Sequence, residues 1–125
     1  MRARLALGLV VLLAACSSGG QPSPSVECRA PVDGRITITA RSLAFDTACL
    51  AMPAGEAVTI VLVNADTVSH NVTIYADSSK STQLFFGEII DGGETIEYHV
   101  PALDAGTDYF DCTVHPGMKG SVVVQ

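Results

Sequence analysis

Hydrophobic and polar residues alternate along several short segments of this chain, from residue 35 onward. Gly, Pro, Asp and Asn bound these segments, and Val, Ile and Thr are frequent within them, as in strands ended by turns. The predicted strands lie in "RITITA" (35–40), "AVTIVLVN" (57–64), "HNVTIYA" (70–76), "ETIEYHV" (94–100), "YFDC" (109–112) and "SVVVQ" (121–125). Residues 78–90 are least clear and are interpreted as a loop with one helical turn. The pattern predicts an all-β sandwich or barrel of about seven or eight strands.

The first 15 residues are predicted to be a signal peptide rather than part of the fold. Arg2 and Arg4 precede an apolar run over residues 5–15, which is shorter than the roughly 20 residues that span a bilayer. The run ends in "LAAC", which resembles the lipobox of bacterial lipoproteins, so Cys16 is expected to become the lipid-bearing N-terminus. An ordinary signal cut near the same place is the alternative.

The rest of the chain divides into a tether and one domain. After Cys16, the stretch "SSGGQPSPS" is small and polar, so residues 16–27 are interpreted as a flexible linker. Residues 28–125 have the size of a single domain. The net charge of the whole chain is −6, and loss of residues 1–15 removes two of its seven basic residues, which gives −8. Such an acidic protein lacks the basic face that a nucleic-acid-binding role requires.

The chain has four cysteines, Cys16, Cys28, Cys49 and Cys112, in an extracytoplasmic compartment where unpaired thiols tend to oxidise. With Cys16 lipidated, Cys28 and Cys49 are predicted to form a disulfide. Two separate buried thiols, or a bond from one of them to Cys112, remain open. The residues around Cys112 suggest a different role for it.

A metal-ligand motif lies near the C-terminus, in "DCTVHPGMKG" (111–120). Cys112, His115 and Met118 follow one another at intervals of three and supply a thiolate, an imidazole and a thioether. Copper electron-transfer sites use two His and one Cys in a near-trigonal plane, with a weak axial Met. The second His is expected to be His70, at the start of a strand after a turn. His99 lies within an alternating strand and is interpreted as a surface residue.

Two segments carry a resemblance to the cupredoxins, the blue copper family of plastocyanin and amicyanin. They are "MPAGEAVTIVLVNADTVSHNVTIY" (52–75) and "AGTDYFDCTVHPGMKGSVVV" (105–124), and the short His-to-Met spacing is like that of amicyanin. The resemblance implies a Greek-key sandwich and one copper ion held by His70, Cys112, His115 and Met118. It further implies that the Asn71 side chain ties its segment to the backbone near Thr113, and that Pro116 helps to line an apolar patch around His115.

These features predict a lipid-anchored, mononuclear blue copper protein that carries single electrons. It is expected to be a monomer anchored to a bacterial membrane, in the periplasm or on the outer face of the cell membrane. Its partner would be a cytochrome or a membrane oxidoreductase with a basic docking face. A copper buffering or delivery module is the alternative. Three His are too few for a multicopper oxidase, and no hydrolytic catalytic set is evident, so no enzyme activity is expected.

Overall fold

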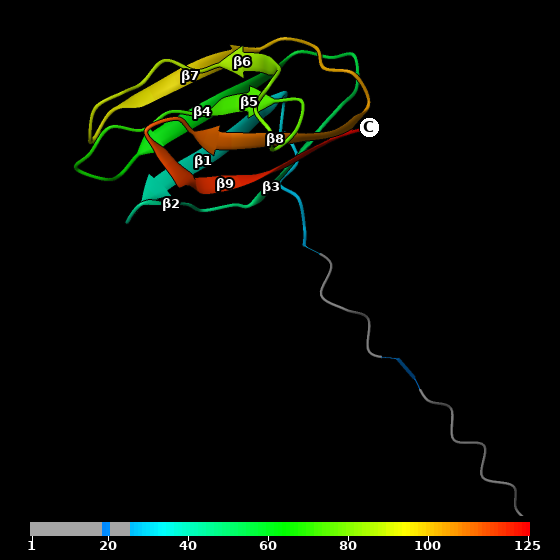
Figure 1. Cartoon of the computed structure of the whole chain (residues 1–125), viewed down its shortest axis with the longest axis horizontal. Coiled ribbons are helices and arrows are strands. Elements are labelled where there is room, and N and C mark those ends of the chain that lie inside the picture. Colours follow the sequence, from blue (N-terminus) through cyan, green and yellow to red (C-terminus); the bar gives the residue numbers. More distant parts are fainter. Residues whose placement is uncertain (1–18, 21–25) are drawn as a thin grey trace, which may run out of the picture.

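The computed structural model describes residues 19–20 and 26–125, which form two facing sheets and contain no helix (Figure 1). The predicted signal peptide, Cys16 and most of the predicted linker lie outside the described residues. No helix among the described residues is long and apolar enough to cross a membrane. The strands are β1 (Arg35–Arg41), β2 (Ala44–Phe45), β3 (Cys49–Met52), β4 (Val58–Asn64), β5 (Thr73–Tyr75), β6 (Gln83–Phe86), β7 (Thr95–Val100), β8 (Gly106–Cys112) and β9 (His115–Val124).

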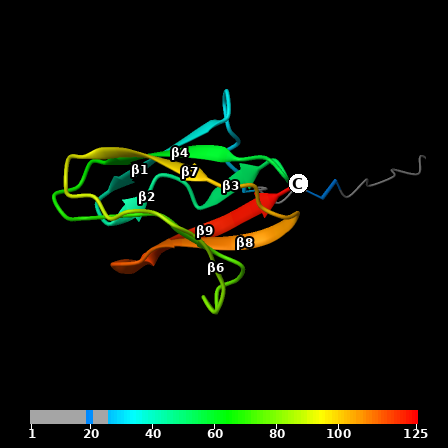
Figure 2. The same cartoon turned by 90° about the horizontal axis from the view of Figure 1, so that it is seen from above.

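The strands form a four-stranded sheet in the order β2-β1-β4-β7 and a five-stranded sheet in the order β3-β9-β8-β5-β6. The β1–β4 and β3–β9 pairs are parallel and the other pairs are antiparallel. Figure 2 shows the two layers from the side, with β1, β4 and β7 in one and β8 and β9 in the other. The predicted all-β sandwich is therefore confirmed.

The core lies between the two layers and follows the alternation in the sequence. In β1, Ile36 and Ile38 are buried while the residues between them face outward, and β4 repeats this pattern with Ile60 and Leu62. β8 and β9 contribute Phe110 and Val122, both fully buried. Removing this apolar surface from water is the main stabilising contribution to the sandwich.

Three strands were not anticipated, and each is short or lies at an edge. β2, β3 and β6 are all edge strands, with two, four and four residues. The helical turn expected within residues 78–90 is wrong, because β6 pairs with β5 there. The burial of β6 does not alternate, since its two central residues are half-buried and its ends are exposed. An edge strand with this pattern gives no period-2 signal.

A disulfide between Cys28 and Cys49 attaches the start of the domain to β3. Beside it, Arg29 forms a parallel bridge with Leu50, and its backbone N–H donates to the Cys49 carbonyl at 2.9 Å. β3 in turn pairs with the last part of β9, where Met52 lies opposite Val124. The beginning and the end of the domain are therefore held side by side.

Three connections meet at the other end of the sandwich, away from the C-terminus (Figure 2). They are the β8–β9 turn, the loop after β4 and the β1–β2 hairpin turn. Because β1 and β4 are parallel neighbours, their C-terminal ends lie at the same end of the sheet, so the hairpin turn and the loop after β4 begin side by side. Residues far apart in the sequence thus come together at this end.

Close packing of β9 against the chain beside it predicts a specific stability effect at Gly120. A Cβ atom there would overlap the backbone carbonyl of Ala48 and lie 2.5 Å from a ring carbon of Phe110. We expect Gly120→Ala to lower the free energy of unfolding by about 1–3 kcal/mol, the usual cost of overpacking. Gly117→Ala, in the same strand with no heavy atom within 4 Å, is the matched control. Urea unfolding of the metal-free proteins measures both; equal midpoints would contradict the prediction.

Candidate metal centre

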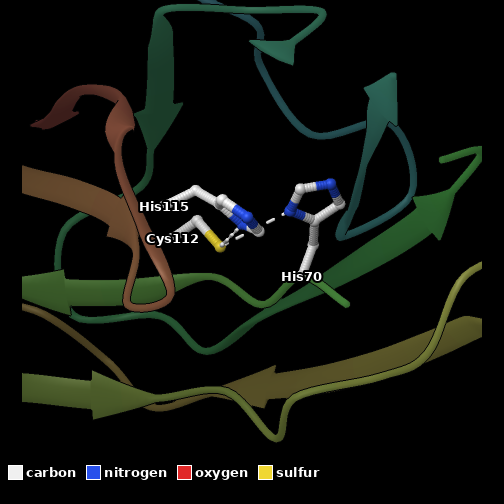
Figure 3. Close-up of side chains that lie close together, drawn as sticks. All are labelled: His70, Cys112 and His115. Atoms are coloured by element: carbon white, nitrogen blue, oxygen red, sulfur yellow. Dashed lines mark hydrogen bonds between the residues drawn. The ribbon is translucent and has the colours of Figure 1, made fainter. Parts of the chain in front are cut away.

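The side chains of His70, Cys112 and His115 converge at the end of the sandwich where the three connections meet (Figure 3). The Cys112 Sγ lies 3.6 Å from the His70 Nδ1 and 3.9 Å from the His115 Nδ1. One ligand atom from each residue lies within 4.8 Å of those of the other two. The two imidazole rings are 4.8 Å apart between centroids and tilted by 59°, so that both direct a nitrogen toward the sulfur.

These distances suit a single metal ion placed between the three donors. A first-row ion such as zinc forms bonds of about 2.0 Å to imidazole nitrogen and about 2.3 Å to thiolate sulfur. In a trigonal plane, such bonds separate the nitrogen and sulfur atoms by about 3.7 Å. The two observed nitrogen–sulfur separations lie on either side of that value. The nitrogen–sulfur separations therefore suit an ion bound between Cys112 and each imidazole.

The four predicted ligands differ in their exposure to solvent. His70 and Cys112 are fully buried, and Met118 is 3% exposed within the same hydrophobic cluster as Cys112. His115 is half-buried. Three of the four predicted ligands are thus shielded from water, and only the His115 imidazole reaches the surface.

The loop after β4 is held in shape by the buried side chain of Asn64. Its Nδ2 donates to the carbonyls of Val68 at 2.8 Å and Asp91 at 3.0 Å, and its Oδ1 accepts from the N–H of Asp66 at 3.1 Å. His70, at the end of this loop, exchanges two backbone hydrogen bonds of 3.0 Å with Ile90. These bonds fix the backbone from which the His70 side chain projects.

The carboxylate of Asp66 determines which nitrogen of His70 is available for a metal. The Nε2 of His70 lies 2.8 Å from the Asp66 Oδ2, and an ionised carboxylate only accepts hydrogen bonds. Nε2 therefore carries the proton, which leaves the lone pair of Nδ1 directed at Cys112. The pKa of Asp66 is lowered by the backbone N–H of Leu43 first, and then by His70, so this carboxyl remains charged.

Asn71 joins the His70 segment to the β8–β9 turn. Its fully buried Oδ1 accepts from the backbone N–H of Thr113 at 2.9 Å and from the Thr113 hydroxyl at 2.8 Å. Its Nδ2 donates to the carbonyl of Gly87 at 2.9 Å and to the Thr73 hydroxyl at 3.2 Å. One amide side chain therefore connects the segments that carry His70 and Cys112.

A second buried carboxylate lies beside Cys112. Asp111 is fully buried and pairs with Lys80, whose amino group also lies 5.8 Å from the ring centroid of Tyr75 and 6.0 Å from that of Tyr109. This pairing raises the pKa of Lys80, mainly through its hydrogen bond to Asp111. Because the charge of Asp111 is compensated, it leaves no isolated buried charge next to the site.

The structure places the sequence-based candidates as follows. His70, Cys112 and His115 lie together, and Met118 is buried in the adjoining core. Thr113 contacts Asn71, and Pro116 is exposed next to His115. His99 is an exposed residue of β7, with its Nδ1 3.4 Å from the Thr59 hydroxyl and apart from this group.

Sequence reasoning missed Asp66 and the Asp111–Lys80 pair. Asp66 lies four residues before His70 in the turn "NADTVS", which marked it only as a turn residue. An acid shortly before a candidate His ligand was the available signal. The sequence does not show which turn residue folds back onto the imidazole, because this depends on the backbone path of the loop.

Comparisons with known proteins identify the family. Residues 5–124 match the family model described as a cupredoxin-like domain. The chain is 30% identical to auracyanin-A of Chloroflexus aurantiacus, with 93% of this chain and 90% of the relative covered. It is also 30% identical to amicyanin of Paracoccus denitrificans, with 83% and 76% covered.

Solved structures agree with this match. Auracyanin A, a blue copper protein from a green thermophilic photosynthetic bacterium, superposes with a TM-score of 0.66 at 27% identity, over 73% of this chain and 98% of that one. Amicyanin from Paracoccus versutus gives a TM-score of 0.56 at 27% identity, over 76% and 84%. The fold, the converging donors and the family match lead to one conclusion: the chain belongs to the cupredoxins, and its cofactor is one copper ion.

Proposed function

We infer that this chain is an extracytoplasmic electron carrier in which His70, Cys112, His115 and Met118 hold the copper ion. The observation that carries the proposal is the convergence of a buried thiol with two imidazole nitrogens at 3.6 and 3.9 Å. Met118 would be the weak axial ligand, because it is a buried thioether close to Cys112 in the chain. The disulfide between Cys28 and Cys49 supports an oxidising compartment outside the cytoplasm.

Copper, when bound, supplies a centre that gains or loses one electron. The residues of this chain supply the rest. Cys112 would bind as the thiolate, and Asp66 keeps the proton of His70 on Nε2, away from the metal position. The strands and the Asn71 clamp hold the donors in one arrangement. A fixed arrangement reduces the rearrangement that accompanies each transfer.

The half-buried His115 is the proposed route for electrons between the site and a partner. Several exposed apolar side chains come from the segments around it: Val114 is 45% exposed, Val68 42% and Leu43 56%, and Pro116 is also exposed. Exposed apolar side chains at the same end of the molecule are proposed to provide a contact surface. A partner that covers it would exclude water from the edge of the imidazole.

The partner is proposed to be a redox protein with a basic docking face, such as a cytochrome or a membrane oxidoreductase. The chain without residues 1–15 has five basic and thirteen acidic residues, a formal charge of −8. Complementary charge would accelerate encounter and make it sensitive to salt. Four protein donors would leave no open position on the ion for a substrate, which supports electron transfer rather than catalysis. The chain is proposed to act as a monomer.

Reconstitution with copper tests the site directly. Residues 17–125 with one equivalent of cupric ion are expected to turn intensely blue, because thiolate-to-copper charge transfer requires the Cys112 sulfur. Cys112→Ser is expected to abolish the colour, whereas His99→Gln should retain it, because His99 lies in β7 apart from the site. Visible absorption measures both. A colourless wild-type protein, or a blue Cys112→Ser variant, would refute the ligand assignment.

Copper buffering or delivery is the second candidate function, and retention of the metal separates it from electron transfer. Because His70, Cys112 and Met118 are buried, we expect the ion to resist removal. The blue band should persist for hours in excess chelator, while electron exchange with a small redox reagent is complete in seconds. Loss of the band within minutes, with slow electron exchange, would favour delivery instead.

Cys16 is proposed to carry a lipid that anchors the protein to a bacterial membrane through the linker of residues 16–27. The domain begins beside β3, and β3 pairs with β9 near its end, where Leu50 lies opposite Val122. Val122 is seven residues from His115, about 23 Å along the strand. A tether at that end would leave the copper end free for a partner.

The anchor predicts a change in fractionation. In bacterial cells, the full chain is expected in the membrane fraction, and Cys16→Ser should lose this association. Ser17→Ala is the control that leaves the thiol in place. Equal membrane association of the Cys16→Ser variant and the full chain would argue against lipidation.

A further inference from the structure

We propose that Asp66 is a positioning residue that lowers the reduction potential of the copper site through His70, and that the β1–β2 hairpin turn holds it in place. This inference rests on the proposed function, in which His70 is a copper ligand. It adds a residue outside the ligand motif, from a loop that the sequence marked only as a turn.

The Asp66 carboxylate brings a negative charge to the His70 imidazole. The Asp66 Oδ2 lies 2.8 Å from the His70 Nε2, and the His70 side chain is fully buried while that of Asp66 is 14% exposed. A carboxylate in this position makes the imidazole a stronger electron donor, and such partners of metal-bound His tune the metal. With the Cys112 thiolate, it would neutralise Cu(II), whereas Cu(I) would leave one excess negative charge. In a dry site this difference favours the oxidised form.

Backbone N–H groups of the β1–β2 hairpin turn hold the Asp66 carboxylate in place. Its Oδ1 accepts from the backbone N–H of Ser42 at 2.6 Å, and its Oδ2 accepts from the backbone N–H of Leu43 at 3.0 Å. Together with His70, three donors therefore fix both oxygens. The carboxylate has no freedom to turn away from the imidazole when the charge at the site changes.

The hairpin turn that provides these donors has an unusual backbone conformation. Arg41 pairs with Ala44, so Ser42 and Leu43 form a two-residue turn, and their φ angles are 52° and 58°. Such turns favour Asn and Gly, because other residues are strained at positive φ. The hydrogen bonds to Asp66 offset this strain. The turn presents two adjacent N–H groups to one carboxylate, an arrangement that suits a bound anion.

A purely structural role is the competing explanation, in which Asp66 only stabilises the hairpin turn. That role predicts a loss of stability without a change in potential. The two explanations therefore separate on the reduction potential of the copper-loaded protein.

The test compares Asp66→Asn with Glu56→Gln, which removes the same charge from an exposed residue at the opposite end of the sandwich. We expect Asp66→Asn to remain blue and to shift the Cu(II):Cu(I) ratio about tenfold toward Cu(I) at a fixed ambient potential. For a one-electron couple this is a rise of about 59 mV. Glu56→Gln should change the Cu(II):Cu(I) ratio less than twofold. Asp66→Glu, which retains the charge, should keep this ratio close to that of the wild-type protein.

Two further measurements keep the proposal testable if Asp66→Asn folds poorly. The double variant Ser42→Asn/Leu43→Gly retains both N–H donors and suits the turn, so we expect an unchanged potential and a higher unfolding temperature. In the wild-type Cu(I) protein, ¹H–¹⁵N NMR should show a proton on the His70 Nε2 that exchanges slowly with water.

The outcomes are distinguishable. If the wild-type protein does not turn blue, the proposed function fails and this inference fails with it. If the site is blue but Asp66→Asn and Glu56→Gln have the same potential, only the role of Asp66 is overturned. An unprotonated His70 Nε2 in the Cu(I) protein would overturn it as well.

Discussion

One buried amide holds the two halves of the copper site together. His70 and Cys112 are separated by 42 positions in the chain, and each comes from a different connection at the end of the sandwich. Asn71 joins these connections through two hydrogen bonds to Thr113 and anchors them to Gly87. Since Asn71 is fully buried, these bonds are not exchanged with water, and breaking one would leave a buried polar group without a partner. The relative position of the donors depends on this connection.

The four proposed ligands differ in how far they are exposed to solvent. Cys112 and His70 are fully buried, and Met118 nearly so, in the core between the sheets, whereas His115 reaches the surface beside exposed apolar residues. A dry interior strengthens electrostatic interactions with the metal position, and a single exposed imidazole limits contact with a partner to one edge. The same arrangement would thus stabilise a bound ion and give the proposed partner access to it.

The residues that support His70 belong to the sheet of β1 and β4 and to its connections. Asn64 ends β4 and holds the following loop, Asp66 contacts the imidazole, and the N–H groups of Ser42 and Leu43 hold Asp66. The parallel pairing of β1 with β4 brings the hairpin turn and this loop to the same end of the sheet. The proposed ligand His70 is therefore supported by a turn near residue 42, which the ligand motif does not include. Asp111 differs, because its charge is compensated by Lys80.

The sequence by itself determined the sandwich class and the four candidate ligands. Alternation in β1, β4 and β7 reports burial directly, because successive side chains in a strand face opposite layers, and the Cys112-to-Met118 spacing lies within one turn and strand. Only the tertiary structure decided the edge strands β2 and β6, the partner of the His70 Nε2, and the ion pair beside Cys112. β2 has only two residues, and the two central residues of β6 are both half-buried, so neither strand shows an alternating pattern. The partners of His70 and Asp111 come from loops whose backbone paths depend on long-range hydrogen bonds. The sequence places an acid four residues before His70, but it does not show that this acid folds back onto the imidazole.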